Sequence, residues 1–137
     1  YRLSAASGDT TNVARLSAAR AFNKIVAFEI VPGAAVTFDD ESTNSGSGTV
    51  LTSGDITTTS AISVALAGYA SYGSDLISVR TINSVANENN RAADNSTGAT
   101  ATLSCVWENV FSSTFTGDAD ATLAGSTAWI VNLISFK

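Results

Sequence analysis

The sequence predicts an all-β fold in a single domain, residues 1–137, and three observations lead to this expectation. Strand-like segments recur about every eight to twelve residues with turn residues between them, a spacing typical of an antiparallel β-sandwich or barrel. Small and β-branched residues dominate the composition, and they suit pleated, half-buried surfaces and tight turns. No segment carries a sustained helical periodicity; the ambiguous window 11–24, "TNVARLSAARAFNK", favours strand–turn–strand over a helix.

Three strands are expected in the first 31 residues. "YRLSAA" precedes a turn at "SGD", "TTNVARLSA" follows it, and "RAFNKIVAFEIV" ends at Pro32-Gly33. In the third segment both alternating sets of side chains are mostly apolar, which indicates a strand covered on both faces.

The middle of the chain predicts a polar loop followed by further strands. The segment 37–50, "TFDDESTNSGSGTV", is rich in Gly and Ser and is expected to be a loop. "GDITTT" and "AISVALAGYAS" are expected as two strands, or as one strand with a bend, and "SDLISVRTI" as another.

The last third of the chain predicts an exposed loop and then strands to the end. The segment 83–98, "NSVANENNRAADNSTG", is polar and Asn-rich, and is expected to be a variable loop. "ATATLSCVWENVF" alternates as a strand, and "STFTGDADATLAG" predicts a short strand, a turn and another strand. The final segment 126–137, "STAWIVNLISFK", is so apolar that we expect it inside the fold, with other strands beside it.

These segments together resemble a family of jelly-roll-like β-sandwich domains found in bacteriophage structural proteins and in bacterial secreted or surface proteins. The resemblance lies in "YRLSAASGDTTNVARLSAARAFNKIVAFEIVPG", "SGDITTTSAISVALAGYAS" and "TLAGSTAWIVNLISFK". It implies a jelly-roll-like sandwich and brings no catalytic residues with it. In the family pattern several strands precede the one that "YRL" resembles, so either the chain is a fragment or another subunit supplies those strands.

Charge and composition exclude several classes of partner. The net charge is −5 and the seven basic residues are scattered singly, so nucleic acid is not an expected partner. The longest apolar runs are too short to cross a bilayer, so no membrane contact is expected. About a quarter of the residues are Ser or Thr and few are charged, a composition that indicates an extracellular or virion-surface protein. The single Cys105 cannot form an intrachain disulfide and is expected to be a small buried hydrophobe.

The acidic residues offer a weak metal-site hypothesis. Asp39, Asp40 and Glu41 are adjacent and could bind a cation such as Ca²⁺, but their spacing matches no EF-hand loop, and such runs are more often simply solvated. Asp118 and Asp120 flank a tight turn, and turn formation explains them without a ligand.

No catalytic constellation is visible. The absence of His excludes Ser–His chemistry, and a Ser–Lys pair through Lys24 or Lys137 has no motif that selects a serine. We therefore expect neither an enzyme nor a cofactor.

The aromatic residues suggest a glycan-binding alternative, because sugar rings stack on flat aromatic faces. Tyr69 and Tyr72, beside glycines at a strand end, are expected to be the exposed pair, and Trp107 is the third candidate. Trp107 and Trp129 lie in alternating strands, where a core position is the more common outcome.

The function hypothesis is a structural protein of a tailed bacteriophage, either a capsid decoration (cement) protein or a head or tail fibre domain. It would associate with copies of itself, a trimer being favoured, and with other virion proteins. The alternatives are a secreted bacterial carbohydrate-binding or adhesion module and a subunit of an extracellular filament. A lectin should group exposed aromatics in one groove, whereas a filament subunit should leave a gap for another chain's strand.

Overall fold

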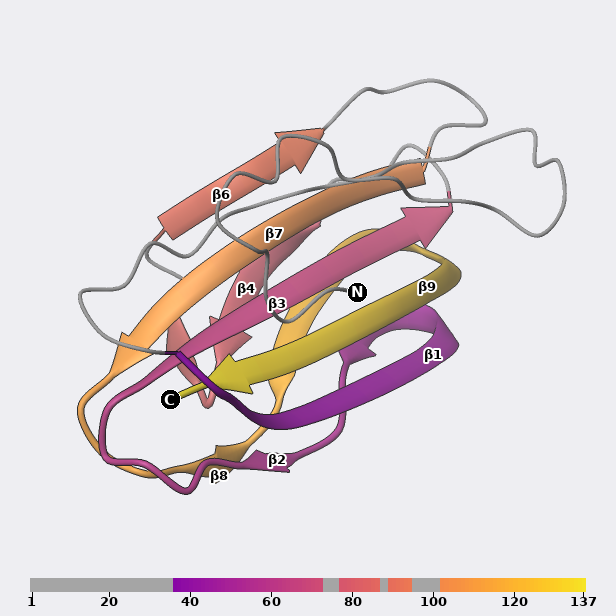
Figure 1. Cartoon of the computed structure of the whole chain (residues 1–137). Coiled ribbons are helices and arrows are strands. Elements are labelled where there is room, and N and C mark those ends of the chain that lie inside the picture. Colours follow the sequence, from indigo (N-terminus) through magenta and orange to yellow (C-terminus); the bar gives the residue numbers. More distant parts are fainter. Residues whose placement is uncertain (1–35, 73–76, 87–88, 95–101) are drawn as a thin grey trace, which may run out of the picture.

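A computed structural model describes residues 36–72, 77–86, 89–94 and 102–137, with only the backbone described for 89–94 and 102–109. These residues form strands and no helix (Figure 1). The strands are β1 (Phe38–Thr52), β2 (Ile56–Thr57), β3 (Ser63–Tyr72), β4 (Ser78–Ile82), β5 (Val85–Ala86), β6 (Asn89–Asp94), β7 (Thr102–Phe111), β8 (Thr116–Gly117) and β9 (Ala119–Phe136). All their pairings are antiparallel, so the predicted all-β antiparallel class is confirmed.

The long strand β9 organises the sheet. The strand order is β5-β4-β9-β3-β7-β6, with β1 also paired to β9, and β2 and β8 form a separate two-stranded sheet. The second half of β9 pairs with β3 on one side and with β1 on the other, while its first half pairs with β4 and β1. The expectation that "STAWIVNLISFK" lies inside the sheet is therefore confirmed.

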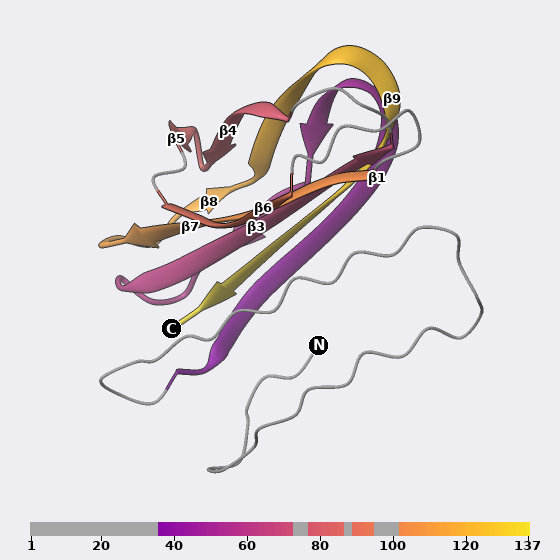
Figure 2. The ribbon, with the colours of Figure 1, turned by 90° about the horizontal axis from the view of Figure 1, so that it is seen from above.

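The sheet curls because β1 and β9 bend together (Figure 2). Their register shifts between Gly48 and Val50: Gly48 pairs with Thr127 but Val50 pairs with Thr122, so β9 carries extra residues on the outside of the bend. Such irregularities increase local twist and bend a strand. The bend brings β4 across from β3, and the hydroxyl of Tyr69 on β3 donates a hydrogen bond to the carbonyl oxygen of Thr81 on β4, at 2.9 Å.

The hydrophobic core lies inside this curl. Its buried members come from β1, β2, β3, β4, β9 and the segments beside them: Leu51, Ile56, Ala65, Ala67, Tyr69, Ile77, Ile82, Phe115, Ala119, Ala121, Leu123, Val131 and Leu133. On β9 the buried residues alternate with exposed or half-buried ones, as expected for a sheet with one face on the core.

The predicted loop at 37–50 is wrong, because most of it belongs to β1. The segment lacks apolar alternation, and its strand conformation comes from the ladder of hydrogen bonds with β9 along nearly its whole length. Its small residues also serve packing. A Cβ at Gly46 would lie 2.7 Å from Cζ2 of Trp129, so the indole of Trp129 occupies the space that a larger side chain would fill.

The predicted loop at 83–98 is also wrong for its described part. Asn83 and Ser84, with φ of 51° and 60°, form the two-residue turn of a hairpin in which Ile82 pairs with Val85. Positive φ at both turn positions is the geometry that matches hairpin twist. Residues 89–94 then form β6, paired with β7, while residues 95–98 lie outside the described residues.

The remaining expectations have mixed outcomes. The strands predicted at "GDITTT", "AISVALAGYAS", "SDLISVRTI" and "ATATLSCVWENVF" are confirmed as β2, β3, β4 and β7, whereas the three predicted before Pro32 lie outside the described residues. The two strands expected within 119–137 are one continuous strand, β9. Among the described residues, no helix has the length and apolar character needed to cross a membrane.

Candidate functional site

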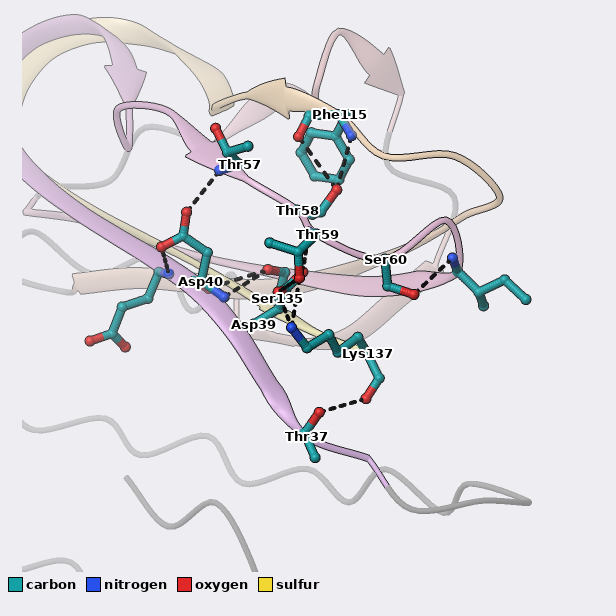
Figure 3. Close-up of polar contacts among 12 residues, drawn as sticks. Thr37, Asp39, Asp40, Thr57, Thr58, Thr59, Ser60, Phe115, Ser135 and Lys137 are labelled. Carbon is teal, nitrogen blue, oxygen red and sulfur yellow. Dashed lines mark hydrogen bonds and ion pairs between the residues drawn. The ribbon is translucent and has the colours of Figure 1, made fainter.

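The acidic run of the sequence lies at the start of β1, where a bulge changes the direction of one side chain. Phe38 pairs with Phe136 and Asp40 pairs with Ser135, so Asp39 is an extra residue on β1. Adjacent residues of a regular strand point to opposite faces, but a bulge breaks this alternation. Asp39 and Asp40 can therefore both direct their carboxylates at the segment 57–59, as Figure 3 shows.

Each carboxylate accepts hydrogen bonds that a neighbouring strand would otherwise accept. The backbone N–H of Thr57 donates to Oδ2 of Asp40 at 2.8 Å, and the N–H of Thr59 donates to Oδ2 of Asp39 at 2.8 Å. The intervening Thr58 faces the other way and exchanges hydrogen bonds with the backbone of Phe115. The segment is thus held between a strand edge on one side and two aspartates on the other.

Lys137 completes this cluster. Its Nζ lies 3.0 Å from Oδ1 of Asp39 and donates to Oγ1 of Thr59 at 2.6 Å, while the hydroxyl of Thr59 donates to Oδ1 of Asp39. The side chain of Asp39 is 1% exposed and that of Lys137 is 38% exposed. Backbone hydrogen bonds between Thr37 and Lys137 join the same two chain segments.

The surroundings of Asp39 lower its pKa. Burial alone raises the pKa, but the hydrogen bonds from the hydroxyl and backbone of Thr59, together with the hydrogen bond and charge of Lys137, outweigh that effect. The ionised carboxylate is therefore stabilised in the folded protein. Asp39 and Asp40 act as a structural clamp on the segment 57–59.

The metal hypothesis receives no support from this geometry. Within the described residues, no group of three or more Cys, Asp, Glu or His side chains is arranged to hold a metal ion. Oxygens of both aspartates accept hydrogen bonds from the protein, since Asp40 also accepts from the N–H of Glu41 at 2.9 Å. The side chain of Glu41 is exposed.

A second group of carboxylates lies where β9 begins. Asp118 accepts a hydrogen bond from the hydroxyl of Thr52 at 2.7 Å, and its backbone carbonyl accepts from the N–H of Asn83 at 2.8 Å. Burial and the negative charge of Asp118 raise the pKa of Asp120, and the charge of Asp55 adds to this. Asp118 is therefore held in place by the backbone of Asn83 and by β1. The prediction that Asp118 and Asp120 flank a tight turn is wrong, because Asp120 lies within β9, opposite Thr52 of β1 and Thr81 of β4.

The aromatic candidates for a glycan site differ in their exposure. Tyr69 is 1% exposed and belongs to the core, so its expected exposure is wrong: residues 65, 67 and 69 of β3 alternate into the interior of the curl. Tyr72 is 54% exposed at the end of β3, as expected. The backbone of Trp107 pairs with Ala67 in the β3–β7 ladder, and its side chain lies outside the described residues, as does that of Cys105.

Trp129 is half-buried and packs against the core, which agrees with its predicted core position. It stands directly opposite Gly46 on β1 and opposite Ser71 on β3. The glycine makes room for the indole ring, and "SGSG" in the sequence is the signal for this close approach.

Comparison with protein-family models, with curated proteins and with solved structures gives no match for this chain. The function of this chain therefore has to be inferred from its own residues. Sequence reasoning missed the clamp, because a bulge between Phe38 and Asp40 is invisible in the residue pattern. It also missed the pairing of β1 with β9, because β1 is almost wholly polar.

Proposed function

We propose that this chain is a structural protein of a bacteriophage virion surface, a capsid decoration protein or a head or tail fibre domain that acts by associating with other subunits. The curled sheet would then be part of a jelly-roll-like β-sandwich. The proposal draws on the strand patterns that resemble such domains and on a hydroxyl-rich composition with few charges, which keeps a densely arrayed protein soluble.

The observation that carries the associative part is a set of apolar side chains left exposed. Ile62, just before β3, is 71% exposed, and Val110, at the end of β7, is 63% exposed. Both lie at the same end of the β3–β7 pair, since Val110 pairs with Val64. Exposed apolar side chains that gather in one place favour burial against another subunit.

The test is the mass of the purified chain by light scattering at micromolar concentration. We expect a closed oligomer, because closed symmetry buries such surfaces. A monodisperse monomer of 14.0 kDa over the whole concentration range would contradict the proposal.

One observation favours the carbohydrate-binding alternative. Tyr72 presents an exposed aromatic side chain at a strand end, where it could stack on a sugar ring. Binding on a glycan array that is lost in Tyr72→Ala and kept in Val79→Ala, a substitution at another exposed apolar residue, would favour this function. Equal binding by both variants, or none by the wild type, would reject it.

A further inference from the structure

One edge of β1 has no partner strand among the described residues. β1 pairs with β9 through one edge, and no strand of the described part of the chain pairs with the other edge. From Asp40 to Gly48 the pairing with β9 runs without a register shift, so this part of β1 is a regular strand. A regular strand with an open edge is a template on which another strand can pair.

Hydrogen-bond donors point outward along this edge. The N–H groups of Glu41 and Ser45 donate to the side-chain oxygens of the residues before them, Asp40 and Asn44, each at 2.9 Å. These groups therefore face away from β9, and because alternate residues of a strand point their N–H groups the same way, those of Thr43 and Ser47 face outward too. Two of these four outward N–H groups thus donate to the side chain of the preceding residue, and the carbonyl groups of a partner strand can take the place of those acceptors.

Between its two bulges, β1 lacks the usual protection of an edge strand. Proteins guard open edges with Lys, Pro, bulges or inward-pointing charges. The segment 42–49 contains no charged residue and no proline, and its side chains at 43, 44, 45, 47 and 49 are exposed. In the described part of the chain these side chains are therefore accessible, and the segment carries no charge that would repel a second strand.

From this open edge we infer that β1 pairs with β1 of a second copy of the chain, antiparallel and centred near Ser45, so that Thr43 lies opposite the partner's Ser47. This inference rests on the proposed function and names a second surface, besides the exposed Ile62 and Val110, through which subunits associate. The contact is isologous, with the same edge contributed by both copies, and joins them about a twofold axis.

Charge selects this orientation. The acidic residues of β1 all lie at its start, Asp39 to Glu41, in a chain of net charge −5. Parallel pairing in register would place Glu41 about 5 Å from the partner's Glu41. Antiparallel pairing about Ser45 separates the two glutamates by eight residues, about 27 Å at the rise of a β-strand. That separation exceeds the screening length of about 8 Å at physiological ionic strength, so the acidic ends do not oppose association.

The experiment measures mass by light scattering over a range of concentrations for the wild type, Ser45→Lys and Asn132→Lys. Ser45→Lys places two like charges opposite each other at the twofold axis, which should weaken association by up to about fivefold. Asn132 is exposed on β9, opposite Thr43, so its replacement adds the same charge to the same face of a strand that has no open edge. Circular dichroism establishes that each variant folds like the wild type.

We expect an even multiple of 14.0 kDa for the wild type, a shift toward a smaller species for Ser45→Lys and no shift for Asn132→Lys. Amide hydrogen exchange at Thr43, Ser45 and Ser47 should slow as the protein concentration rises. A trimer as the largest species, equal effects of the two variants, or exchange independent of concentration would overturn the edge inference and leave association itself standing. A wild-type monomer at every concentration would reject both proposals.

Discussion

The close approach of Gly46 to Trp129 allows a sharp test of the fold. Replacing Gly46 with Ala would place a Cβ 2.7 Å from Cζ2 of Trp129 and 3.2 Å from Cε2 and Cη2. Carbon atoms in contact normally lie about 3.5–4.0 Å apart, so the indole or β1 has to move by close to 1 Å. Trp129 packs against the core and cannot swing freely, and overpacking of this kind costs about 1–3 kcal/mol.

Gly68 provides the matched control. It lies in β3, where an added Cβ meets nothing within 4 Å, and its φ is not in the left-handed region. Gly68→Ala should therefore stabilise the protein by about 0.4–1 kcal/mol, because it reduces the entropy of the unfolded chain without a clash. Replacing glycine with alanine should thus lower the free energy of unfolding at position 46 and raise it at position 68 of the same sheet.

Urea denaturation followed by circular dichroism measures both effects. Gly46→Ala should lower the free energy of unfolding, and adding Trp129→Phe should recover part of the loss, since the smaller ring vacates the space of the added methyl. Two results would show that residue 46 and the Trp129 side chain do not compete for the same space. One is a Gly46→Ala variant as stable as Gly68→Ala. The other is a double variant whose loss of stability equals the sum of the losses from Gly46→Ala and Trp129→Phe alone. The pairing of β1 with β9 at this position would then be refuted.

Three further substitutions test the polar clusters and the hairpin. Asp39→Asn should lower the free energy of unfolding by about 1 kcal/mol at pH 7. Because the pKa of Asp39 is lowered in the folded protein, its ionised carboxylate contributes its full stabilisation above the ordinary pKa of 3.8, and this contribution is lost as the pH falls through the folded-state pKa. The free energies of unfolding of wild type and variant, measured by urea titration, should therefore converge in acid. Asp120→Asn should raise the free energy of unfolding by up to about 1 kcal/mol at pH 7. Because the raised pKa of Asp120 makes its ionisation unfavourable in the folded protein, the gain in stability should be absent below pH 3.8 and grow as the pH rises above it. A gain that is equal at all pH values would contradict this cause. Ser84→Gly should stabilise by about 1 kcal/mol, since Ser84 has a φ of 60° that glycine adopts without strain, and thermal unfolding that shows no gain would argue against this turn.

Apolar alternation predicted the part of the fold that depends on the core. The segments that became β3 and the end of β9 carry residues such as Ala65, Val131 and Leu133 at every second position, and burial of that face fixes the strand. Tyr69 was misplaced because its position beside Gly68 indicated a strand end. Its place in the alternation with Ala65 and Ala67 was the better guide.

β1 could not be predicted from its own residues, because its conformation is imposed by β9. A segment of Ser, Thr, Asn and Gly has no apolar face to bury, and its local preferences favour turns. It becomes a strand because β9 offers it a ladder of hydrogen bonds, and because Leu51 is wholly buried beyond the bend and Asp39 and Asp40 clamp 57–59 at its start. β1 is held by β9 along one edge and by contacts at its two ends, and no strand of the described residues pairs with its other edge. The polar composition that prevented the prediction of β1 therefore also leaves this edge able to pair with a strand of another subunit.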